Sequence, residues 1–235
     1  MSISSLLRPA RAKGALRALA LSACVVATLS VSAPASAALV QTSFANGSLN
    51  VTINRPGQSG QSTSAGGFTG VYNGAAFLSY CIELAQNFTF GTSYNNYSLV
   101  PVASGPNTSP MGPTKAMDLA KLVAENFSDS FSSTVKSVAM QLAVWEIVHE
   151  TSGAYGITSG TFNVNAGNAN VNAARIQADT WLAELPGLTT LAPMIALVSP
   201  TRQDFITVVP VPPSIVLFAG GLLFGLWGVR RRRTA

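Results

Sequence analysis

Cys81 carries the most reactive side chain in this sequence. It lies in the segment Y-C-I-E-L, residues 80–84, and the other cysteine, Cys24, belongs to an N-terminal segment that export would remove. A lone thiol in an oxidising compartment is a liability unless another group occupies it. The sequence therefore raises the question of which side chain lies against Cys81.

A second segment, M-Q-L-A-V-W-E-I at residues 140–147, places a carboxamide on a predicted helix. Gln141 is a polar residue at the margin of an otherwise apolar stripe. Residues 76–84 are predicted to form a strand, and strand alternation puts Cys81 on the same face as Phe77, Ser79 and Glu83. Both segments thus combine one polar, chemically useful side chain with apolar neighbours.

Together the two segments resemble the motifs of the bacterial thioester domains. In that family a cysteine in an aromatic-Cys-aliphatic-acid motif condenses with a glutamine in a Gln-x-Ala-aliphatic-Trp motif. The resemblance implies that Cys81 is the thiol and Gln141 the acyl donor. Glu83 stands where the family commonly has aspartate. The other matching positions are Tyr80, Ala143, Val144 and Trp145.

The resemblance implies single covalent attachment rather than repeated turnover. The thiol attacks the carboxamide carbon, ammonia leaves, and near-attack contact supplies most of the reduction in barrier. An amine or hydroxyl group then displaces Cys81 and becomes bound through Gln141. Glu83 and Glu146 are candidates, by position, for assisting proton transfer. Trp145, one turn after Gln141, is expected to shield the bond or to shape access to it.

Three other roles for Cys81 remain open from the residues alone. A buried cysteine can serve only as a small apolar packing group, or it can form a disulfide with a second chain. A cysteine hydrolase would use His149 as base and Gln141 as oxyanion donor, although a thiol on a strand lacks the helix N-terminus that lowers its pKa. His149 is otherwise expected to be solvated and to interact with the dipole of its helix.

The elements that must position these residues indicate an α+β domain over residues 38–208. Its N-terminal part is predicted to be an antiparallel sheet or sandwich, its middle part carries three helices, and closing strands follow. The predicted strands are residues 48–53, 68–72, 76–84, 95–102, 195–198 and 204–209, and Asn73-Gly74 predicts a tight hairpin. The predicted helices are residues 114–127, 133–150 with Ser132 or Ser133 as cap, and one ending at Leu185 with Asn170 or Asn172 as cap.

Residues 1–37 are predicted to be a secretory signal peptide. Basic residues precede an apolar stretch at 18–31, and Ala35-Ser36-Ala37 offers a cleavage site of small residues. Residues 21–24, L-S-A-C, also match a lipoprotein box, but the apolar stretch before Cys24 is short for that purpose. We expect export across the inner membrane.

The C-terminal residues 209–235 combine a proline-rich motif, an apolar stretch and an arginine cluster. The motif, residues 209–214, contains Val209, Pro210, Val211, Pro212 and Pro213, and the cluster contains Arg230, Arg231, Arg232 and Arg233. The uncharged residues 214–229 are a predicted transmembrane helix, ~24 Å long, which is short for a hydrocarbon core ~30 Å thick. The arginines are expected to stay on the cytoplasmic side as a membrane stop.

This tail resembles the PEP-CTERM sorting signal of Gram-negative bacteria. Val211 stands where that family's usual motif has glutamate. The resemblance implies an exosortase-type transpeptidase as partner, contact with the membrane through the C-terminal helix, and a final place at the cell surface, in the envelope or in the extracellular matrix. A plain C-terminal anchor is the alternative.

Composition excludes one class of partner. Eight of the 14 basic residues lie in the two terminal signals, so residues 38–213 carry six basic and nine acidic side chains, a formal charge of −3. Nucleic-acid binding therefore has no basic surface to rest on. We expect no cofactor, no metal and no enzymatic turnover. The partners are instead exopolysaccharide or surface amines and hydroxyls, or else the protein is a non-covalent structural component of the matrix.

Overall fold

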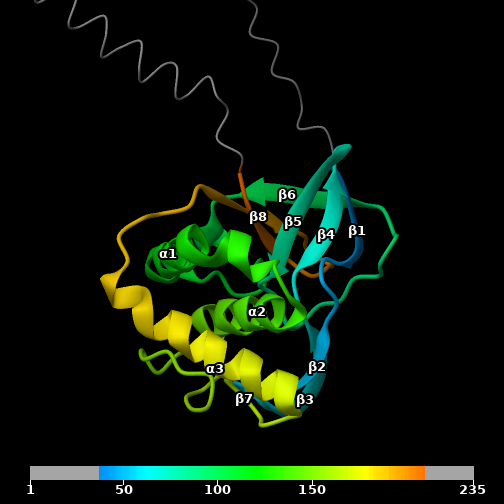
Figure 1. Cartoon of the computed structure of the whole chain (residues 1–235). Helices are drawn as coiled ribbons and strands as arrows, with labels where there is room; N and C mark the ends of the chain where they lie inside the picture. The colour runs from blue at the N-terminus through cyan, green and yellow to red at the C-terminus, as the bar shows by residue number, and fades with distance from the viewer. Residues whose placement is uncertain (1–36, 210–235) are drawn as a thin grey trace, which may run out of the picture. The chain divides into compact units, whose positions relative to one another are not determined.

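The computed structural model describes residues 37–209 and confirms an α+β fold in which strands precede and follow three helices (Figure 1). The strands are β1 Ala37–Phe44, β2 Leu49–Arg55, β3 Gln58–Ala65, β4 Phe68–Tyr72, β5 Ala75–Cys81, β6 Tyr94–Val100, β7 Asn163–Val164, β8 Met194–Val198 and β9 Phe205–Val208. The helices are α1 Gly112–Ser130, α2 Thr134–His149 and α3 Ala169–Glu184, with short 3₁₀ helices at Val102–Ser104 and Leu185–Gly187.

Several predicted segments lie outside the described residues: residues 1–36 of the signal peptide, residues 210–214 of the sorting motif, the transmembrane helix and the arginine cluster. Only Val209 of the sorting motif is described. Within residues 37–209, the structure contains no helix that is both long and apolar enough to span a bilayer.

The strands form a closed barrel and a separate small sheet, where the sequence predicted an antiparallel sheet or sandwich. The barrel order is β1-β4-β5-β9-β8-β6, and the second sheet has the order β3-β2-β7. The late strands β8 and β9 pair between β6 and β5, and β6 pairs back with β1, so the barrel has no free edge. Closure thus depends on strands about a hundred residues apart in the sequence.

Local signals explain most of the individual strands. Asn73 and Gly74 have positive φ angles of 51° and 82°, as a two-residue hairpin requires, and they join β4 to β5 with Tyr72 opposite Ala75. β3 was not predicted because its sequence, QSGQSTSA, has no apolar alternation. It forms by backbone pairing with β2 at a sheet edge. β5 ends at Cys81, three residues earlier than predicted.

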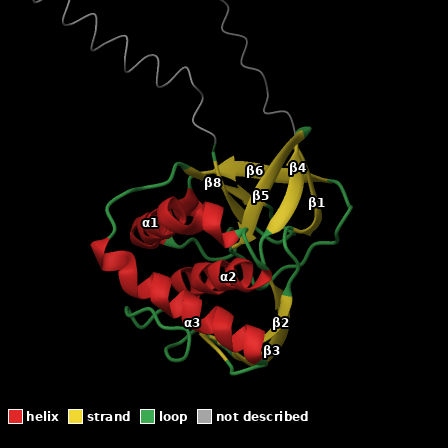
Figure 2. Ribbon diagram, viewed as in Figure 1, coloured by secondary structure: helices red, strands yellow, loops and turns green. Residues whose placement is uncertain are grey.

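Helix α2 lies at the centre of the helical part, against α1, α3 and β5 (Figure 2). Ser133 caps it as predicted, and its hydroxyl accepts a hydrogen bond from the Lys136 amide at 3.2 Å. The sequence predicted one apolar stripe, but every residue from Ser137 to Val148 is buried, because neighbours cover α2 on all sides. The cap of α3 is Asn168, not Asn170 or Asn172.

Candidate functional site

Cys81 lies at the point where the barrel meets the helices. It is the last residue of β5, where it pairs with Phe205 of β9, and α2 packs against the same strand. None of its surface is exposed to solvent. A disulfide with a second chain would therefore require the fold to open.

Gln141 reaches Cys81, as the sequence predicted, but its carboxamide binds the backbone and not the sulfur. Its Oε1 accepts a hydrogen bond from the Cys81 amide at 3.0 Å, and its Nε2 donates to the Cys81 carbonyl at 2.8 Å. The side chain is fully buried. Gln141 therefore satisfies both backbone groups at the end of β5, and the expectation that it faces the thiol is corrected by this geometry.

The glutamine that contacts the sulfur is Gln203, which sequence reasoning missed. Its Nε2 lies 2.7 Å from Cys81 Sγ and donates to the Glu83 carbonyl at 3.1 Å. The Cys81–Phe205 register, continued by two residues, sets Glu83 opposite Gln203. Unlike Gln141, Gln203 is partly exposed. Gln203 thus keeps some surface in contact with solvent, while the thiol is fully buried.

Neighbouring contacts hold Gln203 in place from both sides of the chain. The Tyr97 hydroxyl donates to the backbone carbonyl of Gln203 at 2.6 Å, and the Arg202 guanidinium lies 5.0 Å from the centre of the Tyr94 ring. The buried Asp204 carboxylate accepts from the amides of Ser199 and Asn107, while burial raises its pKa to about 6. The segment before β9 is therefore fixed to β6 and to the loop that precedes α1.

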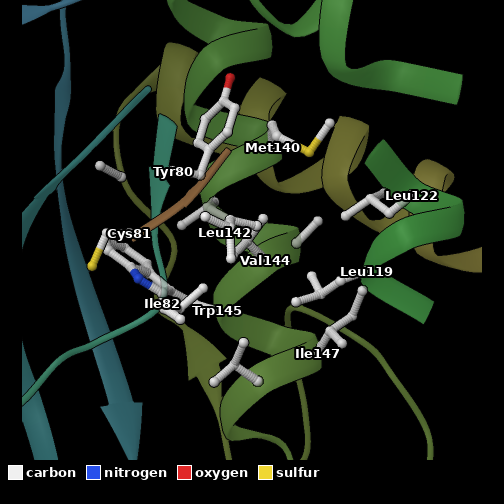
Figure 3. Packing of buried hydrophobic residues seen from close by; sticks show 14 of the residues in the cluster. Tyr80, Cys81, Ile82, Leu119, Leu122, Met140, Leu142, Val144, Trp145 and Ile147 are labelled. Atoms are coloured by element: carbon white, nitrogen blue, oxygen red, sulfur yellow. The ribbon is translucent and has the colours of Figure 1, made fainter. Parts of the chain in front are cut away.

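Trp145 lies beside the Cys81 sulfur, as the sequence predicted (Figure 3). The indole is 1% exposed, and its N–H has no nitrogen or oxygen acceptor in the described part of the chain. Burial raises the pKa of Cys81 to about 12, against smaller opposing effects of the Trp145 indole and the Glu83 backbone. The site keeps the sulfur protonated and dry, which suits a protected bond better than a free thiolate nucleophile.

The side chains of the remaining residues of the two motifs make structural contacts rather than contacts with the sulfur. The Glu83 carboxylate accepts from the amides of Leu84 and Ala85 and from the Thr108 hydroxyl, so it fixes the turn after β5. Tyr80 points away from the sulfur, and its hydroxyl donates to Ser130 Oγ at 2.8 Å (Figure 3). Ala143 is fully buried within α2.

Glu146 contacts a different part of the molecule from Cys81. Its Oε1 accepts from the Gly156 amide at 2.8 Å, and its buried Oε2 has no hydrogen-bond partner among the described residues. Its electrostatic neighbours are Glu150, Asp179 and Lys115. Successive side chains on an α-helix point about 100° apart, so Glu146 points in a different direction from Trp145. Its position therefore does not support the expected role in proton transfer at Cys81.

We expect Glu146→Gln to stabilise the domain in a pH-dependent way. Burial raises the pKa of Glu146 from 4.5 to about 8. Between these values the folded state holds a proton that the unfolded state has released, so wild-type stability falls as pH rises. The side-chain amide of the variant does not ionise, so the stability of the variant does not fall in this way. Thermal melts should give equal Tm values near pH 4 and a higher Tm for the variant at pH 8, by roughly 2–4 °C for each kcal/mol gained.

The exposed Glu125 on α1 provides the matched control, and Glu125→Gln should shift Tm little at either pH. A Glu146→Gln effect of the same size at pH 4 and pH 8 would show that the carboxyl is already ionised in the folded state.

His149 is enclosed at the C-terminal end of α2 and is not the solvated residue that the sequence predicted. Its Nε2 is buried without a hydrogen-bond partner among the described residues, and its ring packs 6.2 Å from that of Phe162. The ring forms a hydrogen bond with the backbone of Ile82. The contacts of Cys81 Sγ within the described structure involve Glu83, Gln203 and Trp145 but not His149. The geometry does not assemble a cysteine–histidine pair.

Within residues 37–209, histidine, cysteine, aspartate and glutamate side chains form no group of three or more that could hold a metal ion. The chain matches no protein family, no characterised protein and no solved structure. Its function is therefore inferred from the geometry around Cys81.

Proposed function

We propose that this protein is an exported surface or matrix protein that attaches covalently to extracellular amines or hydroxyls through an internal thioester at Cys81. The 2.7 Å contact between Cys81 Sγ and Nε2 of the Gln203 carboxamide, the nitrogen next to the acyl carbon, carries this proposal. It brings a thiol and an acyl donor together in a site where the thiol is wholly enclosed.

Gln203 is the better acyl donor of the two glutamines. Both carboxamide atoms of Gln141 are engaged with the Cys81 backbone, so an attack on its carbon would break two buried hydrogen bonds. Gln203 contacts the sulfur directly and is partly exposed. Gln141 then acts as the residue that positions the end of β5.

The reaction balances without any added reagent. Cys81 Sγ bonds to the Gln203 side-chain carbon, the carbon–nitrogen bond breaks, and ammonia leaves with the thiol proton. An amine or hydroxyl later attacks the same carbon, the carbon–sulfur bond breaks, and the proton of the nucleophile returns to sulfur. The product is an amide or ester through Gln203 and a free Cys81, so each molecule reacts once.

The terminal sequences support delivery to the cell surface. The predicted signal peptide directs export, and the resemblance of residues 209–235 to the PEP-CTERM signal suggests handover to an exosortase-type transpeptidase after a stay in the membrane. A structural role in the envelope or exopolysaccharide matrix, with Cys81 only packed, is the alternative. The complete burial of Cys81 is the observation that favours it.

The intact mass of the protein tests the thioester. We expect the wild-type chain to be lighter than its sequence mass by one ammonia, and methylamine treatment to add one adduct. Cys81→Ala should show the full mass expected for its sequence and no adduct. A wild-type protein of full mass, with one thiol that titrates freely after unfolding, would contradict the thioester. The structural role would then be the remaining explanation.

A further inference from the structure

A pocket of about 330 Å³ lies against the segment that follows Cys81, and it gathers positive charge. Its chemistry-bearing residues are Arg55, Lys115 and His149, and we call it the Arg55 pocket. The described part of the chain has six basic residues, and two of them line this pocket together with the one histidine of the whole sequence. Because the domain carries more acidic than basic residues, its composition alone does not explain why these cations lie together in one pocket.

The two cations in the pocket keep hydrogen-bond donors to spare. Arg55 uses Nε and Nη2 to bind Gln61, Gln58 and the Leu84 carbonyl, which leaves the two N–H groups of Nη1. Lys115 Nζ donates to the carbonyls of Val148 and Glu150 at 2.8 and 2.7 Å, and an ammonium has a third proton. Neither forms an ion pair with a carboxylate among the described residues, in which the ion pairs are Lys121–Asp118 and Lys136–Asp129.

Two acids that interact electrostatically with Lys115 use their carboxylates to bind other parts of the chain. Glu150 interacts with Lys115 electrostatically, but its carboxylate accepts hydrogen bonds from the 151–152 and 161–162 backbone and from the Thr161 hydroxyl. Glu146 also acts on Lys115 from a distance, and its Oε1 is bound to Gly156. Neither acid lines the pocket, so a bound anion would not face a carboxylate in its wall.

His149 gives the pocket an acceptor beside the two donors. Burial, together with the nearby charges of Arg55 and Lys115, lowers the pKa of His149 to about 4, so the ring is neutral at neutral pH. Because Nε2 has no partner, the hydrogen bond with the Ile82 backbone uses Nδ1. Nε2 is then a buried, unpartnered lone pair on a residue that lines the pocket, and a ligand hydroxyl that reaches it would satisfy it.

We propose that the Arg55 pocket binds an acidic sugar, with its carboxylate on Arg55 and Lys115 and a neighbouring hydroxyl on His149. The free N–H groups of Arg55 Nη1 and the third proton of the Lys115 ammonium can each donate to a carboxylate oxygen in a charge-assisted hydrogen bond. The volume is at the lower end for small-molecule sites. Carboxylate and hydroxyl on adjacent positions of one ligand are the chemistry of a uronic acid unit.

The position of the pocket connects this ligand to the thioester. Arg55 binds the Leu84 carbonyl and His149 binds the Ile82 backbone, so two residues that line the pocket contact the segment that follows Cys81. This step rests on the proposed function: a uronic acid held there belongs to a chain whose hydroxyl attacks the Gln203 acyl carbon. The hydroxyl oxygen bonds to that carbon, the carbon–sulfur bond breaks, and the hydroxyl proton returns to Cys81. An acidic polysaccharide is then the target of attachment.

Proton NMR of the single histidine tests the pocket without any thioester. The full-length Cys81→Ala protein, purified in a non-ionic detergent, is titrated with sodium glucuronate, glucose or sodium phosphate. We expect glucuronate to shift the His149 ring signals to saturation, and glucose and phosphate to bind at least about tenfold more weakly, since each offers only half of the contacts. Equal shifts with glucose or with phosphate, or no shift with glucuronate, would overturn the proposal.

Substitution of Arg55 provides the second measurement. Arg55→Gln should weaken glucuronate binding by about tenfold or more, whereas Lys136→Gln, in the partly exposed first turn of α2, should leave it unchanged. If circular dichroism shows that Arg55→Gln does not fold, Arg55→Lys keeps the charge, removes the free N–H groups of Nη1, and should still weaken binding. Unchanged affinity in the folded variant would refute the assignment. The mass of the wild-type protein reports separately on the thioester, so the two proposals can fail independently.

Discussion

Gln203→Glu is expected to abolish the thioester completely. A carboxylate carries no amine to release and is a poor acyl donor, while the substitution keeps the length and shape of a side chain that is already partly exposed. The variant should show no ammonia deficit and no methylamine adduct. Its intact mass should equal that of wild-type protein after hydrolysis, because water added across the Cys81–Gln203 bond leaves a thiol and a glutamate.

The matched control is Gln177→Glu on α3, which changes the same functional group away from Cys81 and should keep both the deficit and the adduct. Peptide mapping of the methylamine adduct gives an independent answer. An adduct on Gln141, or a deficit that survives in Gln203→Glu, would refute the assignment of Gln203 as acyl donor.

Gln141→Leu is expected to cause a large loss of stability. Leucine fills a similar volume but leaves the Cys81 amide and carbonyl buried without partners. Each unsatisfied group costs about 1–3 kcal/mol, so the free energy of unfolding should fall by roughly 2–6 kcal/mol, out of a total of about 5–15 kcal/mol. Urea unfolding of the two proteins, followed by circular dichroism, measures the difference.

Met140→Leu, at the adjacent and equally buried position of α2, is the control for packing changes. A volume-conserving apolar exchange there should cost less than about 1.5 kcal/mol. If Gln141→Leu is no more destabilising than Met140→Leu, the two hydrogen bonds to the end of β5 do not contribute as proposed.

Local sequence signals predicted those parts of the fold in which the interacting residues are close along the chain. Asn73-Gly74 gave the hairpin between β4 and β5, and Ser133 gave the start of α2, because turn and cap chemistry act within a few residues. The two motifs also predicted that Cys81 and Gln141 lie close together, and in the structure the Gln141 carboxamide binds the Cys81 backbone. The pairing of β3 was missed because its polar sequence owes its structure to the backbone of β2.

The sequence alone placed Cys81 on a strand and Gln141 on a helix, because alternation along a strand and the helical period are local patterns. Only the tertiary structure decided that Gln203 is the glutamine at the sulfur and that the sheet closes into a barrel. Both depend on β9 pairing with β5 over more than a hundred residues. Such pairing leaves no local pattern, because backbone hydrogen bonds between strands are the same for every sequence and only packing of the whole barrel selects the partners.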